Sequence, residues 1–185
     1  MILGLDFDGV LHPMNNAALG RFCRLPLLEA WLRQRPGVEV VVTSSWREDH
    51  SLDSLRDFFA EDLRPRLVGV TPLAHRLFGP AWSRTPEERA QARYVRQAEL
   101  EAWMRGACHP GPWVALDDNP ELYEPGCPHL VVCDPEVGLT DERLQELWNL
   151  AAPHLIAEAH ARLEQEVASG KRDARSLAVI PPSMI

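Results

Sequence analysis

The sequence predicts an α/β fold, a Rossmann-like three-layer sandwich with a mainly parallel sheet and a minimal cap. Two observations predict it. Short apolar segments alternate along the chain with helical patterns, which is typical of a parallel sheet connected by helices. Three of these apolar segments end in polar residues, as expected where an open α/β sheet binds its ligands.

The apolar segments predict five strands, over residues 2–7, 39–43, 67–70, 113–117 and 130–133. Helices are expected over residues 25–34, 53–60, 86–105, 141–150 and 157–167. The break Arg35-Pro36-Gly37 ends the first helix. Thr85 and Glu88 form a capping-box pattern at the start of the third.

The length of 185 residues is that of one domain with an appendage. We expect a core over residues 1–151, with a small lid near residues 71–86, where prolines and glycines interrupt the pattern. Residues 152–185 are expected to form a C-terminal helix and a mobile tail.

The composition excludes some classes of function. The net charge of −8 disfavours broad, nonspecific binding to nucleic acid. Apolar runs stay shorter than a membrane span, and we see no signal-peptide pattern, so we expect a cytoplasmic protein with no membrane partner. The four cysteines form no CxxC pair and are expected to be reduced thiols. Nothing in the sequence indicates a stable protein partner.

The N-terminal run MILGLDFDGVLHP places two acids, Asp6 and Asp8, at the end of the first apolar segment. A buried parallel strand that meets solvent has this pattern. Two carboxylates at such an edge repel each other, so a cation is expected between them. Oxygen ligands favour Mg²⁺. The alternative is that both acids simply open a turn. A calcium loop is disfavoured because the acids that such a loop needs downstream are absent.

Polar residues also follow two later strands. Thr43-Ser44-Ser45 ends the second predicted strand, and Asp117-Asp118-Asn119 ends the fourth. The carboxyl ends of parallel strands share one edge, so all three groups can meet there. Carboxylates, hydroxyls and a magnesium ion together support phosphoryl transfer. Read alone, the first group could instead form a helix N-cap and the second an Asx turn.

The segments LDFDGVLHP, VVVTSSWR and WVALDDNP, in this order, resemble the haloacid dehalogenase (HAD) superfamily of aspartate-dependent phosphohydrolases. The resemblance covers residues 1 to about 151 and is closest to the HAD domain of "Swiss Army knife" RNA repair proteins. It implies a nucleophile at Asp6, a general acid and base at Asp8, and a phosphate-binding hydroxyl at Thr43 or Ser44. The implied metal site is formed by Asp6, Asp8 through its backbone carbonyl, Asp118, and Asp117 in support.

The family also places a Lys or Arg between the second motif and the acidic strand end. The single lysine, Lys171, follows Asp118 and is therefore out of order. An arginine must replace it, and Arg96 is the first choice, with Arg93 second. An arginine is always charged and grips phosphate with two donors. The alternative for Arg96 is a surface ion pair with Glu99 or Glu101.

Three residues beside the motifs are candidates for substrate binding: His12, Trp46 and Arg47. His12 could equally be an ordinary loop residue, and Trp46 could pack in the core. The expected activity is Mg²⁺-dependent hydrolysis of a phosphomonoester through an aspartyl-phosphate, with a nucleotide or RNA end as substrate. The alternatives are a small phosphorylated metabolite, or an inactive HAD fold that binds or regulates.

Overall fold

The computed structural model describes residues 1–15, 17–80, 84–109, 111–169 and 171. Five strands form one sheet: β1 (Ile2–Leu5), β2 (Glu39–Val42), β3 (Leu67–Val70), β4 (Trp113–Asp117) and β5 (Leu130–Val132). Their order is β3-β2-β1-β4-β5, and every pairing is parallel. This is the Rossmann-like topology that the sequence predicts, with β1 at the centre.

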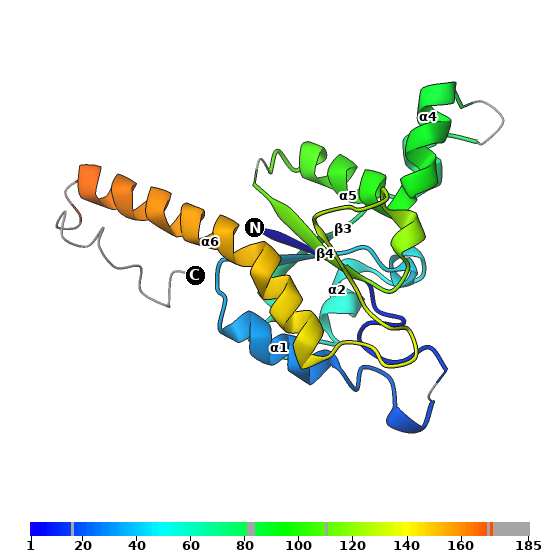
Figure 1. Cartoon of the computed structure of the whole chain (residues 1–185), viewed down its shortest axis with the longest axis horizontal. Helices are drawn as coiled ribbons and strands as arrows, with labels where there is room; N and C mark the ends of the chain where they lie inside the picture. Colours follow the sequence, from blue (N-terminus) through cyan, green and yellow to red (C-terminus); the bar gives the residue numbers. More distant parts are fainter. Residues whose placement is uncertain (16, 81–83, 110, 170, 172–185) are drawn as a thin grey trace.

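The sheet has a helical layer on each face, as a three-layer sandwich requires (Figure 1). Helices α1 (Leu25–Arg33), α2 (Leu52–Arg56) and α6 (Asp141–Ala168) cover one face, and α5 (Val95–Gly106) covers the other. Alternation along β1 divides the core between the two faces. Leu3 and Leu5 pack under α1 and α6, whereas Ile2 packs with Leu100 and Met104 of α5.

The sequence predicts a single helix over residues 86–105, and the structure divides it. The capping box of Thr85 and Glu88 starts α4 (Pro86–Gln91) as predicted. A 3-10 turn, η5 (Ala92–Tyr94), then separates α4 from α5, and Tyr94 leaves the helical conformation with φ −104° and ψ 60°. The break allows α4 to stand away from the sheet while α5 lies along it (Figure 1).

The C-terminal helices that the sequence predicts separately are one helix, α6, which passes through Pro153. A proline inside a helix removes a hydrogen bond and crowds the preceding turn, so continuing the helix through Pro153 has a cost. Packing outweighs this cost. The buried residues of α6 recur every three or four positions on both sides of the proline: Leu144, Leu147, Ala151, Leu155, Ala159 and Leu163.

The segment between β3 and α5 contains α3 (Ala74–Phe78) and α4. Its role as a lid stays a prediction, and residues 81–83 within it lie outside the described residues. The predicted tail over residues 172–185 also lies outside them. No helix among the described residues combines the length and the apolar character that a membrane crossing requires.

Candidate active site

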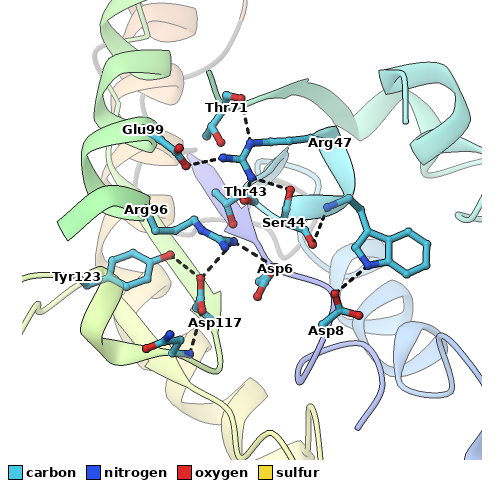
Figure 2. A network of polar contacts seen from close by, with 12 residues as sticks. Asp6, Asp8, Thr43, Ser44, Arg47, Thr71, Arg96, Glu99, Asp117 and Tyr123 are labelled. Atoms are coloured by element: carbon cyan, nitrogen blue, oxygen red, sulfur yellow. Dashed lines mark hydrogen bonds and ion pairs between the residues drawn. The ribbon is translucent and has the colours of Figure 1, made fainter. Parts of the chain in front are cut away.

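The ends of β1, β2 and β4 meet at one edge of the sheet (Figure 2). Backbone hydrogen bonds connect them: Thr43 N–H donates to the carbonyl of Leu5 at 2.9 Å, and Asp6 N–H donates to that of Leu116 at 3.0 Å. Each strand therefore delivers its polar residues to the same place, because the three strands are in register.

Three carboxylates gather at this edge. Asp6, Asp117 and Asp118 each have an oxygen within 4.8 Å of the other two. Asp6 and Asp117 are buried, and Asp118 is half-buried. Gly9 allows this approach, because its φ of +69° favours glycine and a Cβ there would collide with the Asp118 carboxylate.

Arg96 supplies the positive charge of the cluster. Its Nη1 lies 3.1 Å from Oδ1 of Asp6 and 3.6 Å from Oδ2 of Asp117. Burial lowers the pKa of Arg96, but the charges of Asp6 and Asp117 outweigh burial and the net shift is upward. Arg93, the second candidate, lies on η5 with its exposed guanidinium over the Tyr94 ring.

Asp117 is fixed by two further contacts. The Tyr123 hydroxyl donates to its Oδ2 at 3.1 Å, and Asn119 N–H donates to its Oδ1 at 3.0 Å. Burial, followed by the charge of Asp6, raises the pKa of Asp117 to about 7. The same two causes raise the pKa of Asp118. A cluster that resists ionisation in this way, and that consists of oxygen donors only, fits a hard divalent cation such as Mg²⁺.

Asp8 is turned away from this cluster. Its Oδ1 lies 3.0 Å from Nε2 of His12, and its Oδ2 accepts a hydrogen bond of 2.9 Å from Nε1 of Trp46. Of the residues implied to form the metal site, Asp8 is thus the one whose carboxylate lies outside it. The sequence indicates either a site role or a loop position for His12, and either a site role or core packing for Trp46. The structure gives each a contact with Asp8.

The two candidate hydroxyls differ in their surroundings. Ser44 is the N-cap of η2 (Ser45–Glu48), and its Oγ accepts a hydrogen bond from Trp46 N–H at 3.5 Å. Thr43 is fully buried, and its Oγ1 has no hydrogen-bond partner among the described residues. The N-cap alternative therefore describes Ser44, while the hydroxyl of Thr43 remains available.

Arg47 lines a groove together with Thr71 and Arg76, so its role in substrate binding stays a prediction, and its guanidinium is held by several neighbouring groups. Its Nε donates to the carbonyl of Thr71 at 3.1 Å, and its Nη1 donates to the carbonyls of Thr43 and of Ser44, the latter at 2.7 Å. Its Nη2 donates to Oε2 of Glu99, and both side chains of this pair are only 4% exposed. The guanidinium therefore supports the loop after β2 from inside.

Sequence reasoning did not find the roles of Glu99 and Tyr123. Glu99 was weighed only as a surface partner of Arg96, yet it is buried and also accepts a hydrogen bond of 2.8 Å from Ala74 N–H. Its spacing was a usable signal, because residues three apart on α5 share one face with Arg96. Tyr123 follows Asp117 by six residues in a turn, where no pattern indicates its contact.

The strand order and the carboxylates after β1 and β4 define a Rossmann-like domain of the haloacid dehalogenase class. Comparison with protein-family models is more specific. Residues 2–144 match the HAD domain in Swiss Army Knife RNA repair proteins, and the chain belongs to this family. No curated protein and no solved structure matches the chain significantly.

Proposed function

We propose that this protein is a Mg²⁺-dependent phosphomonoesterase that forms an aspartyl-phosphate on Asp6. The observation that carries the proposal is the contact of Arg96 with Asp6 and Asp117, beside the carboxylate of Asp118. A cation that touches the nucleophile at a sheet edge offsets the charge of an incoming phosphate. Membership of the HAD family supports the same reaction class.

The reaction has two steps. In the first, a carboxylate oxygen of Asp6 bonds to phosphorus, the bond from phosphorus to the leaving oxygen breaks, and Asp8 gives its carboxyl proton to that oxygen. In the second, the Asp8 carboxylate takes a proton from water while the water oxygen bonds to phosphorus. The bond from phosphorus to Asp6 then breaks, and inorganic phosphate leaves.

The surrounding residues orient the phosphate. The guanidinium of Arg96 balances its charge. The Oγ1 of Thr43, which has no hydrogen-bond partner in the described part of the chain, donates to a phosphoryl oxygen. The carboxylates of Asp6 and Asp118 and the backbone carbonyl of Asp8 would hold Mg²⁺, with Asp117 in support. When bound, the ion neutralises phosphate charge and favours in-line attack.

The proposed substrate is a phosphorylated nucleotide or RNA end. The family description, which refers to RNA repair proteins, supports this class. The short segment between β3 and α5 supports it as well, because a small cap suits a bulky substrate. A small phosphorylated metabolite is the alternative substrate, and an inactive binding module is the alternative function.

The test is release of inorganic phosphate from 5′- and 3′-phosphorylated oligoribonucleotides, nucleotides and sugar phosphates, with Mg²⁺ or with EDTA. We expect release only with Mg²⁺, fastest from the nucleic-acid ends. Asp6→Asn is the control and should abolish release while the protein still folds. Preference for a sugar phosphate would favour the small metabolite as the substrate class. Absence of phosphate release from every compound would favour the inactive binding module.

A further inference from the structure

We propose that His12 and Trp46 are positioning residues that hold the Asp8 carboxyl group for proton transfer to the leaving group. The inference rests on the proposed function, since it assigns an environment to the general acid of that reaction. It concerns the half of the site opposite Arg96, where Figure 2 shows Asp8 on the other side of Asp6.

Each oxygen of Asp8 has its own partner. Nε2 of His12 lies 3.0 Å from Oδ1, and Nε1–H of Trp46 lies 2.9 Å from Oδ2. The two partners come from different segments, four and thirty-eight residues away in the chain. An aspartate side chain has two torsions, and two contacts from separate segments fix both. Asp6 and Asp8 thus have different partners, as two carboxylates with different roles require.

Both partners are themselves held by packing. The indole of Trp46 meets the rings of Phe7 and Phe22 edge to face, at centroid distances of 5.9 and 5.2 Å. The imidazole of His12 also packs against Phe22, at 5.4 Å. Among the described residues, Nδ1 of His12 is buried without a hydrogen-bond partner. We therefore assign the ring proton to Nε2, which makes His12 a donor to Asp8.

Asp8 remains accessible despite these contacts. Its side chain is 39% exposed, and it lines a groove together with His12, Met14, Arg21 and Trp46. Asp6 and Arg96 are not among the residues that line this groove. A leaving group that points into it would place its oxygen next to the carboxyl group that His12 and Trp46 hold.

A positioning role and a merely structural role have different consequences. A well-placed general acid matters most when the leaving oxygen is strongly basic, because only such an oxygen needs a proton as the bond breaks. A leaving group that is a stable anion departs without one. Loss of positioning therefore makes the rate depend more steeply on the leaving group, whereas loss of folding lowers all rates together.

The experiment measures kcat/KM with Mg²⁺ for a series of aryl phosphates from phenyl phosphate to 2,4-dinitrophenyl phosphate. Trp46→Phe removes the N–H donor and keeps an aromatic ring. His12→Phe removes the other donor, and His12→Gln restores an N–H at similar reach. His50→Gln is the matched control, because His50 packs on Trp46 at 5.4 Å within the same aromatic group.

We expect Trp46→Phe and His12→Phe to lose about tenfold more activity on phenyl phosphate than on the dinitrophenyl ester. His12→Gln should recover most of this difference, and His50→Gln should keep the wild-type dependence. Equal losses across the series would overturn the inference and leave the proposed function standing. A wild-type protein without turnover on any ester would overturn the proposed function, and the inference with it.

Discussion

Arg96 and Asp6 are in contact across 90 residues of sequence, with Nη1 of the arginine 3.1 Å from Oδ1 of the aspartate. The helix α5, which precedes β4 in the chain, delivers this cation to the end of β1 (Figure 2). Lys171 follows the end of α6 at Ala168 and so comes after Asp118 in the chain. The contact supports the prediction that Arg96 is the cation of the phosphate site.

The first prediction concerns this arginine. Arg96→Ala should lower kcat by at least about tenfold, because it removes a charge-assisted contact to the phosphate and to Asp6. Arg96→Lys should recover only part of the loss, because an ammonium group cannot copy the planar, two-pronged guanidinium. Steady-state kinetics with Mg²⁺ present measures both.

Arg93→Ala is the matched control for Arg96. Arg93 precedes Arg96 by three residues, but it is exposed and stacks over the ring of Tyr94. Its kcat should stay within about twofold of wild type. A loss at Arg93 as large as the loss at Arg96 would contradict the assignment of the cation.

The second prediction follows from the raised pKa of Asp117, about 7 in the folded protein against an ordinary 3.8. Between these values the folded state keeps a proton that the unfolded state has lost, so this group's contribution to stability falls as pH rises from about 4 to about 7. Mg²⁺ needs ionised carboxylates, so its binding should release protons and strengthen over the same window.

Thermal unfolding with and without Mg²⁺ checks this prediction. The rise in Tm caused by Mg²⁺ should be larger at about pH 8 than at about pH 5.5. Asp117→Asn should flatten the pH dependence of the metal-free protein, because it removes the group that titrates. A rise in Tm that is the same at both pH values would count against the raised pKa.

The third prediction concerns the buried pair Arg47–Glu99. Glu99→Ala leaves a buried guanidinium without its anionic partner and should lower the free energy of unfolding by about 3 kcal/mol. The exposed pair of Arg33 and Asp62 is the control. Asp62→Ala should cost less than about 1 kcal/mol, because solvent screens this pair. Denaturant unfolding measures both, and equal losses would show that burial of the pair does not matter.

The parts of the site that depend on strand ends could be predicted from the sequence. Asp6 and Asp118 each follow an apolar run, and parallel pairing alone brings such runs to one edge. Apolar runs also predict where the strands begin and end, and β3 and β4 match their predicted residues. Local pattern and chain topology act together at these positions, so the prediction needs no knowledge of side-chain partners.

The positions that depend on distant partners could not be predicted. Arg47 follows the second motif directly, and its neighbours in sequence do not indicate the buried ion pair that it forms. Its direction is set by Glu99, 52 residues later in the chain. The helix α6 is similar, since its local pattern predicts an end near residue 150, whereas the buried stripe along it continues through Pro153. In both cases tertiary packing outweighs the local preference.

The last prediction concerns Gly9, which has a positive φ and lies against the carboxylate of Asp118. Gly9→Ala should lower the free energy of unfolding by about 1–3 kcal/mol through backbone strain, and should also displace Asp118 from the carboxylate cluster. Gly126→Ala is the matched control, because Gly126 has φ +73° and no atom of the described residues lies near enough to meet a Cβ. Both variants should lose stability, but only Gly9→Ala should need a higher Mg²⁺ concentration for half-maximal turnover. An unchanged Mg²⁺ requirement in Gly9→Ala would mean that Asp118 does not hold the metal.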